Sequence, residues 1–391
     1  MKIDVDVVVI GGGIAGLWTL RRLRDEGYNA VLLESEALGA GQTRYAQGII
    51  HGGTKYALTG KLTASSEAVA GMPAIWRACH QGRGEVDLRQ AKLISDAHYL
   101  WSTSNLASRI TGFFASQVMR ERTVALSTQQ RPSLFRHRAF KGAIYRLDEP
   151  VFDAISVLQA LAVPVMPAIL AINKHALLMR PSTLEVEAVN GDSFELNYKR
   201  LVFMAGQGNE DLLNAAELRA PAMQLRPLKM VIMRGGLSES VFAHCMGAGV
   251  NPRLTITSHL DDEDNIVWYL GGQLAEDGVF RSDSGQIAHA QQELDELIPW
   301  LPQQGLQWAT LDINRAEVRH ADGHRPDTCY AVRQDAIITA WPIKMALAPL
   351  LARQVLDLVA DVDKTSGELP AWPQPAFAEY PWCEPARWGM T

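Results

Sequence analysis

The feature that most constrains this chain is a strand–helix–strand unit at its beginning. Val5–Ile10 is an almost continuous apolar run rich in β-branched residues, which is typical of a strand covered on both faces of a parallel sheet. Glycines interrupt the run, and apolar residues then recur at helical spacing until Gly27 ends the helix. A second strand, Asn29–Glu34, completes a βαβ unit.

Gly11, Gly13 and Gly16 give this unit the G-x-G-x-x-G pattern of a dinucleotide-binding site. Gly11 permits a tight turn, Gly13 lets the backbone approach a pyrophosphate, and Gly16 lets helix and strand pack closely. The helix N-terminus directs N–H groups and the positive end of its dipole at the phosphates. Glu34, about 20 residues further on, can accept both ribose hydroxyls and would repel the 2′-phosphate of NADP. The pattern predicts FAD or NAD; the alternative is that the glycines only turn the chain.

Size and charge point to two domains and a small ligand. At 391 residues the chain exceeds one simple core, so two packed domains are expected. The net charge of -6 argues against a nucleic-acid partner, because such proteins normally carry a basic stripe. We therefore expect a small-molecule substrate and no nucleic acid.

Cysteines and apolar segments indicate neither a metal centre nor a membrane span. The cysteines are far apart in the sequence: Cys79, Cys245, Cys329 and Cys383. Without a Cys-x-x-Cys pair, neither a zinc site nor a redox dithiol is expected. Asp4 and Asp6 make the N-terminus unlike a signal peptide, and Pro164 and Pro167 interrupt the most apolar later stretch, 151–172. We expect a cytoplasmic protein with reduced thiols and no integral membrane segment.

The remaining chain alternates helical and extended segments. A segment rich in Gly, Thr, Gln and Tyr, 39–60, is expected to form a ligand-facing loop. Helices are expected at 63–79, 106–119, 153–161 and 343–359, and strands at 87–95, 168–173, 183–189, 200–204 and 336–340. Between residues 225 and 310, short strands alternate with turns, which predicts a mainly β region.

Three segments resemble a known flavoprotein family. Residues 6–16, Asp-Val-Val-Val-Ile-Gly-Gly-Gly-Ile-Ala-Gly, with Leu-Leu-Glu ending at Glu34, look like the N-terminus of the family of D-amino acid oxidase, glycine oxidase, sarcosine oxidase and FAD-dependent glycerol-3-phosphate dehydrogenase. Residues 41–56 resemble its second flavin-contacting loop, and Ile50–Gly53 is closest to the glycerol-3-phosphate dehydrogenase branch. Met204–Gly206 resembles its Ala-Thr-Gly turn. The resemblance spans most of the chain and implies FAD rather than NAD.

The resemblance also implies which residues hold the cofactor. Val151–Asp153 and the helix after it are similar to the segment before the family's adenine-side strand, which places that strand at 163–165. The residues implied to contact FAD are Gly11, Gly13, Ile14, Ala15, Gly16, Glu34, Ser35, Gln42, Thr43, Gln47, Gly48, Val165, Ala205, Gly206, Ile343, Lys344 and Met345. They come from stretches far apart in the sequence, so the fold must bring them together.

The segment before the last helix departs from the family pattern. Many members have a Gly-His-Gly-like loop there, whereas Thr339–Met345 contains no glycine, and its Lys344 resembles the lysine of a Gly-Lys-Leu-Thr turn in glycerol-3-phosphate dehydrogenases. Reduction of a flavin places negative charge around N1 and the C2 oxygen, which a cation or a helix N-terminus stabilises. Lys344, expected in the first turn of the last helix, is the candidate; the alternative is a solvated lysine.

His51 is the candidate catalytic residue of the flavin-side loop. It is expected to contact the flavin ring, to act as a base, or to bear a covalent flavin link. Gly48 and Gly52 are expected to let the backbone lie close to the ring. The alternative is a histidine that makes only structural hydrogen bonds.

Arginine is the candidate for holding the substrate. Residues 316–323 are similar to the family's Arg-Pro-x-x-x-Asp-Gly region, where an arginine binds the substrate carboxylate, and this implies that role for Arg319. A planar guanidinium matches a carboxylate with two parallel hydrogen bonds. A surface ion pair is the alternative for Arg319, and Arg325 is a weaker candidate. Arg253 and Tyr269 are expected to line the pocket from the β domain.

The sequence as a whole predicts an α/β fold in two domains. A Rossmann-like FAD-binding domain is expected to be joined to a mixed or antiparallel, β-rich substrate domain. The expected boundaries are 1–80, 140–220 and 325–365 for the discontinuous FAD-binding domain, 81–139 and 221–324 for the substrate domain, and 366–391 for a tail.

The favoured activity is FAD-dependent oxidation of a small amine or amino acid by hydride transfer to flavin N5. One alternative is dehydrogenation of a hydroxy compound, such as glycerol 3-phosphate or a 2-hydroxy acid. Another is a non-catalytic FAD-binding module. Oxygen and a quinone both stay open as the electron acceptor.

Overall fold

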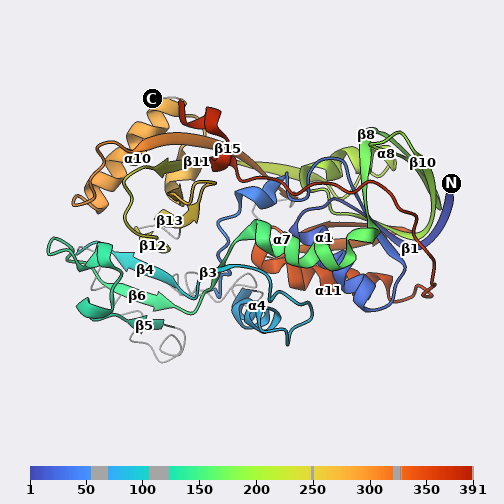
Figure 1. Ribbon diagram of the computed structural model, residues 1–391, viewed down its shortest axis with the longest axis horizontal. Helices are drawn as coiled ribbons and strands as arrows, with labels where there is room; N and C mark the ends of the chain where they lie inside the picture. The colour runs from blue at the N-terminus through green and yellow to red at the C-terminus, as the bar shows by residue number, and fades with distance from the viewer. Residues whose placement is uncertain (54–68, 105–122, 248–250, 320–325, 327, 390–391) are drawn as a thin grey trace.

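Two β-sheets, set side by side, organise the protein (Figure 1). The computed structural model describes residues 1–53, 69–104, 123–247, 251–319, 326 and 328–389. One sheet has seven strands and the other has eight. Two long antiparallel strands of the second sheet join the two halves: β11 (Met223–Arg234) and β15 (Gln307–Val318). β11 begins, and β15 ends, against the core of the first sheet.

The first sheet has a parallel core. In spatial order its strands are β8 (Ile169–Arg180), β2 (Ala30–Glu34), β1 (Lys2–Ile10), β10 (Ser193–Phe203) and β17 (Ile337–Trp341). Each pair of neighbours runs parallel. Parallel strands end at a common edge, where ligands bind in sheets of this kind. The glycine turn and the segments after Glu34, Phe203 and Trp341 therefore share one edge.

A β-meander and a layer of helices cover the two faces of this sheet. β9 (Thr183–Ala188) lies antiparallel to β8 and β10, and because β10 also pairs with β1, these strands close into a ring with β2. The helices are α1 (Ile14–Asp25), α7 (Ala154–Ala162) and α11 (Ala348–Val359). Val7 and Val9 of β1 pack under the helices, whereas Val8 and Ile10 pack under the meander. The continuous apolar run of β1 is thus buried on both faces.

The second sheet is antiparallel except for one pair. In spatial order its strands are β15, β11, β14 (Ile266–Gly271), β13 (Pro252–Leu260), β12 (Ala243–Met246), β4 (His98–Ser102), β6 (Ile144–Leu147) and β5 (Thr123–Ala125). Helix α10 (Asp283–Leu297) covers one face, where Trp101, Trp268 and Leu294 share a core. The other face meets the loop that follows β2. It is apolar where Ile232, Tyr269 and Leu311 share a core, and polar on β13, where Thr255 and Thr257 alternate with apolar residues; this second part is the polar face.

Short elements complete the described fold. They are α4 (Met72–His80), α8 (Asn209–Ala215), α9 (Gln273–Asp277), β16 (Tyr330–Gln334) at the edge beside β17, and the pair β3 (Leu93–Ser95) and β7 (Val151–Phe152). The chain then ends in extended backbone with 3-10 turns at Pro381–Cys383 and Pro385–Gly389.

The expected elements are largely confirmed in the first sheet and less so elsewhere. The βαβ unit, the strand within β10, the helix α7 and the strand β17 all form. Segment 87–95 is a strand only from Leu93, because Leu88–Ala91 makes a turn. Helix α10 was not expected in the β region. The expected helix at 106–119 and residues 63–68 of the one at 63–79 lie outside the described residues, and the rest of the second helix forms mainly as α4.

One expected domain boundary also shifts. β6 pairs with β4 and β5 in the second sheet, so the chain leaves that sheet after Leu147 and not near residue 140. It rejoins the first half at Val151, which bridges to Ile49. The physical reason is that β6 supplies a central strand that the second sheet needs between β4 and β5.

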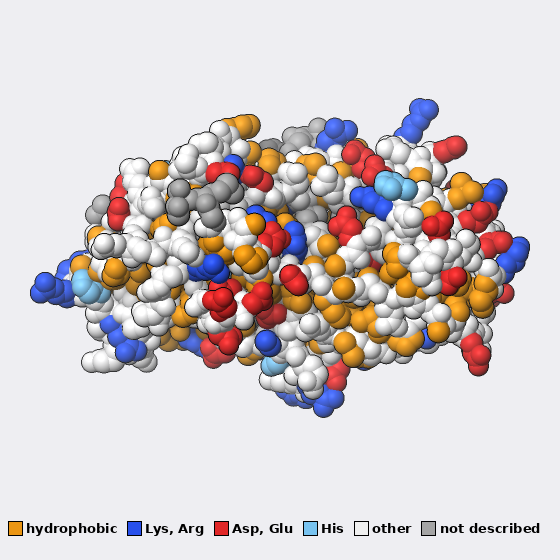
Figure 2. Space-filling view, turned by 45° about the horizontal axis from the view of Figure 1, so that its top comes forward, with side chains coloured by type: hydrophobic (Ala, Val, Ile, Leu, Met, Phe, Trp, Pro, Cys, Tyr) orange, Lys and Arg blue, Asp and Glu red, His pale blue; other side chains and the backbone are white. Residues whose placement is uncertain are grey.

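Charged side chains of both signs are interspersed over the face of the molecule in Figure 2, where no continuous basic stripe is visible. Within the described ranges, no helix combines the length and apolar character needed to cross a bilayer. In the same ranges, no three His, Cys, Asp or Glu side chains are grouped to bind a metal ion. None of the four cysteines forms a disulfide.

Candidate active site

The glycine turn between β1 and α1 is packed too tightly for larger residues. Gly11 has a φ of +116°, and a Cβ there would lie 2.5 Å from the carbonyl oxygen of Met204. A Cβ on Gly16 would lie 1.9 Å from the carbonyl oxygen of Gly11. A Cβ on Gly13 would meet only the Thr43 hydroxyl, at 3.3 Å. Packing therefore requires Gly11 and Gly16, whereas Gly13 leaves the backbone open where a pyrophosphate is expected.

The N-terminus of α1 follows this turn directly. Its N-cap residue, Gly13, has no side chain to cap the helix. The N–H of Ile14 donates to the Thr43 hydroxyl over 3.1 Å. Ala15 and Gly16 lie in the same first turn, whose free N–H groups and dipole favour an anion. The fold thus brings Thr43, from the loop after β2, to the helix end that the sequence assigned to the phosphates.

Glu34 ends β2 at the same edge. One carboxylate oxygen accepts the N–H of Gly12 at 2.6 Å, and the other accepts those of Ser35 and Glu36, both at 2.8 Å. Burial raises the pKa of Glu34 above its usual value, although these N–H groups act against the shift. The carboxylate is therefore fixed beside the glycine turn, in the position that hydrogen bonds to a ribose require.

The turn after β10 is held at this edge by Asn209, a residue that the sequence did not single out. Its side-chain oxygen accepts the N–H of Ala205 at 2.8 Å, and its amide donates to the carbonyl oxygen of Ala340 at 3.1 Å. Gly206 follows with a φ of +58°. A buried asparagine just after the Ala-Gly turn is a signal that this position has a structural role, because buried amides need partners.

The strand expected at 163–165 is wrong. Val163–Ala168 is a 3-10 helix, because its two prolines lack the N–H groups that a sheet strand donates. The strand beside β2 is β8, in which Ala171 stands opposite Glu34. Ala171 therefore stands next to Glu34, where a residue of the expected strand 163–165 would have been.

The loop after β2 runs between the two sheets. Gln42 accepts the N–H of Ala316 in β15 at 3.2 Å. Gln47 donates to the hydroxyl of Thr257 and to the carbonyl oxygen of Tyr269, both at 3.2 Å. These side chains fix the loop to the polar face of the second sheet, so the loop connects the glycine turn to that face. We refer to residues 39–53 as the flavin loop.

Gly48 and Gly52 of the flavin loop pack against the protein itself. Gly48 has a φ of +74°, and a Cβ there would lie 2.0 Å from the carbonyl oxygen of Phe152. A Cβ on Gly52 would lie 3.2 Å from Pro73. These contacts account for both glycines without a flavin ring, which differs from the expected reason for them.

His51 is paired with a buried carboxylate. Its Nδ1 lies 3.3 Å from Oε2 of Glu149, whose Oε1 accepts the N–H of Gly52 at 2.8 Å. The Glu149 side chain is only 3% exposed, against 16% for His51. Burial alone would raise the pKa of Glu149, but the hydrogen bond and charge of His51, the charge of His98 and the Gly52 N–H hold it below its usual range. Glu149 is therefore ionised at neutral pH and orients the imidazole.

Two further histidines extend this pair into the second sheet. The His244 ring in β12 stacks on His51 at 5.6 Å between centroids, and the His98 ring in β4 lies 4.2 Å from that of His244. Nδ1 of His244 lies 2.8 Å from the Thr255 hydroxyl. The sequence reasoning missed both histidines. The alternation of Thr255 and Thr257 with apolar residues was the available sign that this strand has a polar face.

The segment after β17 differs from the expectation. α11 begins at Ala348, and Lys344 precedes the 3-10 turn Met345–Leu347 with an extended backbone, φ −150°. Ile343 has a φ of +52°, which is rare for a β-branched residue and interrupts any helix there. Lys344 therefore lies before the last helix and not in its first turn. It remains in the loop at the carboxyl edge of the first sheet.

Arg253 points away from the polar face. The β12–β13 pairing contains a bulge next to Arg253, since Cys245 pairs with Leu254 but Met246 pairs with Pro252. The guanidinium pairs with Glu293 at 2.6 Å and also with Glu296, both on α10. Because α10 covers the opposite face, the bulge removes Arg253 from the expected pocket.

Of the two remaining described candidates for the substrate pocket, Tyr269 is buried and Arg319 is exposed. Tyr269 is fully buried, and its hydroxyl donates to the carbonyl oxygen of Tyr45 at 3.0 Å, so it holds the flavin loop from the second sheet. Arg319 follows β15 with an exposed side chain, and its N–H donates to the carbonyl oxygen of Ala222 at 2.8 Å. Arg325 lies outside the described residues.

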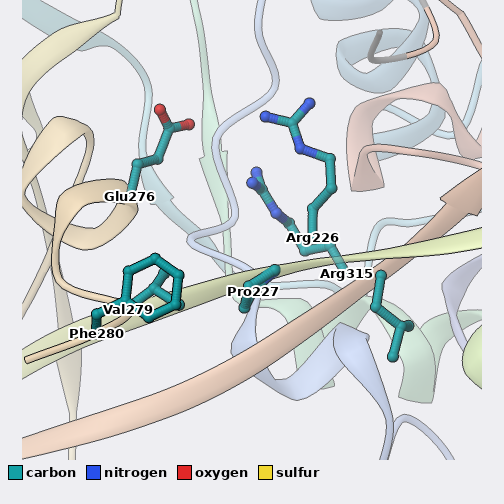
Figure 3. Close-up of a pocket in the computed structure, with 7 residues that line it drawn as sticks. Arg226, Pro227, Glu276, Val279, Phe280 and Arg315 are labelled. Atoms are coloured by element: carbon teal, nitrogen blue, oxygen red, sulfur yellow. The ribbon is translucent and has the colours of Figure 1, made fainter. Parts of the chain in front are cut away.

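A surface hollow between β11, β15 and α9 is separate from these residues (Figure 3). Arg226 and Arg315 stand opposite each other in the strand register, with Glu276 across from them. Their charges have protein partners: Arg226 lies 3.7 Å from Glu317, and Glu276 accepts the Asn251 amide at 2.9 Å. None of the cofactor, catalytic or substrate candidates lines the hollow.

Comparison with known proteins identifies the family of the chain. Residues 6–327 match the family model of the FAD dependent oxidoreductases. A relative from Pseudomonas aeruginosa, the probable FAD-dependent oxidoreductase PA4991, is 44% identical over 384 residues, which cover 97% of this chain and 98% of the relative. The chain belongs to the FAD-dependent oxidoreductase family. This oxidoreductase is similar to the crystal structure of PA4991 with a TM-score of 0.85 and 39% identity over 98% of each chain.

More distant structures share the fold of this oxidoreductase. Glycine oxidase from Geobacillus kaustophilus matches with a TM-score of 0.64 and 16% identity, covering 93% of this chain and 96% of that one. L-α-glycerophosphate oxidase from Mycoplasma pneumoniae, solved with FAD bound, matches with a TM-score of 0.64 and 13% identity, covering 96% and 98%. The α/β architecture expected from the sequence is confirmed.

FAD is the cofactor of this oxidoreductase, and the residues at the carboxyl edge of the first sheet fit it. A Cβ on Gly13 would meet only the Thr43 hydroxyl, so the backbone there is open to the approach of a pyrophosphate. The N-terminus of α1 suits the phosphates and the Glu34 carboxylate suits a ribose. The flavin loop leads from this site to His51 and the polar face of the second sheet.

Proposed function

We propose that this oxidoreductase oxidises a small hydroxy compound at its carbinol carbon, with His51 as the base. The observation that supports the proposal is the pairing of His51 with the buried Glu149. A hydroxyl must lose a proton as its carbon loses a hydride, whereas a neutral amine can release a hydride without a base. The fold does not separate the two substrates, since a glycine oxidase and a glycerophosphate oxidase share it.

The pair defines which nitrogen of His51 acts. Because Glu149 is ionised, it accepts a hydrogen bond, so Nδ1 of His51 carries the hydrogen and Nε2 presents the lone pair. In the proposed reaction, Nε2 takes the hydroxyl proton and the carbonyl bond forms as the hydride leaves the same carbon. Bound FAD supplies the hydride acceptor. Glu149 then stabilises the imidazolium until the proton is released.

Arg319 and Lys344 keep their proposed roles. We assign the substrate carboxylate to Arg319, because a guanidinium at the end of β15 can bind it with two hydrogen bonds. We assign to Lys344 the negative charge that develops on the cofactor, because its loop follows β17 at the edge where the cofactor segments meet. The assignment of Arg319 calls for a carboxylate on the substrate, which among hydroxy compounds favours a 2-hydroxy acid.

Anaerobic reduction of the holoenzyme tests the substrate class. The flavin absorbance is recorded after mixing with 2-hydroxy acids, glycerol 3-phosphate, amino acids and simple amines. We expect bleaching by a hydroxy compound and none by amines. If only amines or amino acids bleach the flavin, the substrate belongs to the amine class and the proposal is wrong.

His51→Asn tests the role of the base with the substrate so identified. We expect flavin reduction to slow by about a hundredfold to ten-thousandfold, the usual contribution of a general base. His175→Asn, at an exposed position on β8, is the control and should reduce at the wild-type rate. If His51→Asn reduces as fast as the wild type, the base is a different group.

A further inference from the structure

The C-terminal segment 365–389, which we call the strap, crosses from the first sheet to the second (Figure 1). At one end, the N–H and hydroxyl of Thr365 donate to the Asp6 carboxylate of β1 at 2.9 and 2.8 Å. At the other end, Trp388 is buried against the second sheet, and the guanidinium of Arg234 in β11 lies 4.3 Å from the centre of its ring. The strap therefore spans both halves of the molecule.

Between its ends the strap bonds to segments that border the FAD site. Its Pro373 carbonyl oxygen accepts the N–H of Ala171 at 2.8 Å, and Ala171 is the β8 residue beside the ribose-binding carboxylate. The backbone of Leu38 donates to Ala376 at 2.8 Å and accepts from Ala378 at 3.0 Å. Leu38 begins the turn into the flavin loop, so the strap supports the loop from outside.

Tyr380 fixes the strap to helix α7. Its hydroxyl donates to the Asp153 carboxylate at 2.9 Å and accepts the N–H of Ile155 at 3.1 Å. Burial, together with the charge of Asp153, raises the pKa of Tyr380 well above its usual range. The hydroxyl therefore stays protonated and keeps donating at every pH at which the fold is stable.

Trp382 fixes the strap to the second sheet. Its ring stacks on Tyr380 at 4.4 Å between centroids, with 12° between the planes, and also contacts His259 at 4.6 Å and Tyr269 at 5.5 Å. Its indole N–H donates to the carbonyl oxygen of Leu260 at 3.1 Å. Burial lowers the pKa of His259 to about 4, so that ring is neutral and packs as an aromatic. Trp382 itself is fully buried.

The flavin loop contacts both this cluster and the second sheet. Tyr45 packs against the core that contains Trp382, and its carbonyl oxygen accepts the Tyr269 hydroxyl at 3.0 Å. Arg44 lies 3.4 Å from the Glu384 carboxylate of the strap. Residues 42–45 are thus held by the sheet on one side and by the strap on the other.

We propose that the strap retains FAD in the protein, with Tyr380 and Trp382 as the positioning residues that keep the flavin loop closed over the cofactor. A surface loop opens when the contacts that cover it break, so weaker contacts make opening more frequent. FAD leaves through the opening made when residues 379–389 detach, so weaker strap contacts raise the open population and the release rate together. The proposal does not depend on which substrate the enzyme oxidises.

The test compares two variants at the strap–loop contact with one elsewhere on the strap. Tyr380→Phe removes a single oxygen, and Trp382→Ala removes the stacked ring. Trp372→Ala is the matched control, since Trp372 is also a buried strap tryptophan but packs against Phe194 in the core under the meander. FAD release from each holoenzyme is followed by flavin fluorescence after dilution, well below the midpoint of thermal unfolding.

We expect Tyr380→Phe to release FAD about tenfold faster and Trp382→Ala about a hundredfold faster than the wild type. Trp372→Ala should lower the unfolding midpoint but release FAD at the wild-type rate. Wild-type release from Tyr380→Phe and Trp382→Ala overturns the proposal, as does equal acceleration in Trp372→Ala, which would indicate general destabilisation. If Trp382→Ala does not fold, Tyr380→Phe against the control decides.

Discussion

Among the residues that the structure describes, the partners of the buried Glu149 carboxylate are an imidazole and a backbone N–H. Its ionised form therefore depends on neighbours that themselves respond to protons. An ionised carboxylate that is only 3% exposed and lacks such partners would strongly destabilise the fold. This residue consequently couples the protonation of His51 to the stability of the segment that joins β6 to β7.

Glu149→Gln should change how stability depends on pH. Folding lowers the pKa of Glu149 below its usual 4.5, so the ionised group stabilises the fold above that pH, and the contribution is lost as the pH falls through the lower folded value. We expect the variant to lose about 1.5 to 3 kcal/mol at neutral pH and progressively less in acid. Urea unfolding across this range measures it. Asp148→Asn, at the exposed neighbour, should cost no more than about 1 kcal/mol; an equal loss there would contradict the assignment.

Glu34→Ala should weaken FAD binding. The variant removes a carboxylate whose hydrogen bonds to a ribose would contribute about 1.5 to 3 kcal/mol each, so Kd should rise at least about tenfold. Titration of the apoprotein with FAD, followed by flavin fluorescence, measures the change. Glu36→Ala, at the exposed position two residues later, is the control and should bind FAD as the wild type does. An unchanged Kd in Glu34→Ala would mean that another group holds the ribose.

At the scale of elements, the turn between β1 and α1 tolerates no side chain at Gly16. Gly16→Ala should destabilise the fold by about 1 to 3 kcal/mol, because the new methyl group would overlap the Gly11 carbonyl oxygen and force the helix from the strand. Gly71→Ala is the control, since nothing lies within 4 Å of its added Cβ, and its effect should stay within about 0.5 kcal/mol. Denaturant unfolding compares the two. Equal stability of both variants would show that the turn can relax.

Elements defined by local pattern were predictable from the sequence, and contacts between distant segments were not. The β-branched run of β1 and the glycines after it fix the βαβ unit within one short stretch. The partner of His51 lies 98 residues away, and no local spacing announces Glu149. The prediction that Arg253 lines the pocket was wrong for another reason. A bulge reverses the side of the sheet to which Arg253 points. The family resemblance predicts a strand at Val165, although the neighbouring prolines, Pro164 and Pro167, already indicate that this segment does not pair in a sheet.

For the whole molecule, FAD should stabilise both halves at once. The flavin loop, the paired strands β11 and β15 and the strap all connect the two sheets, so the halves should unfold together. FAD at about 100 times its Kd should add about 2.7 kcal/mol to the free energy of unfolding. Calorimetry of apoprotein and holoprotein should show one transition that moves to higher temperature with FAD. Two separate transitions, with only one shifted, would contradict this coupling.

The closed ring of strands in the first sheet also limits how far the chain can fold while it is being synthesised on the ribosome. β1 is translated well before β10, yet it pairs along its length with β10, in which Glu195 stands opposite Lys2. β17 completes the sheet later still, through Ile337–Trp341. β2, the partner on one edge of β1, follows soon after it, but the other edge of this apolar strand has no partner until β10 is translated. Until then the backbone N–H and C=O groups on that edge have no partner in the sheet, a state that refolding of the complete chain does not reproduce.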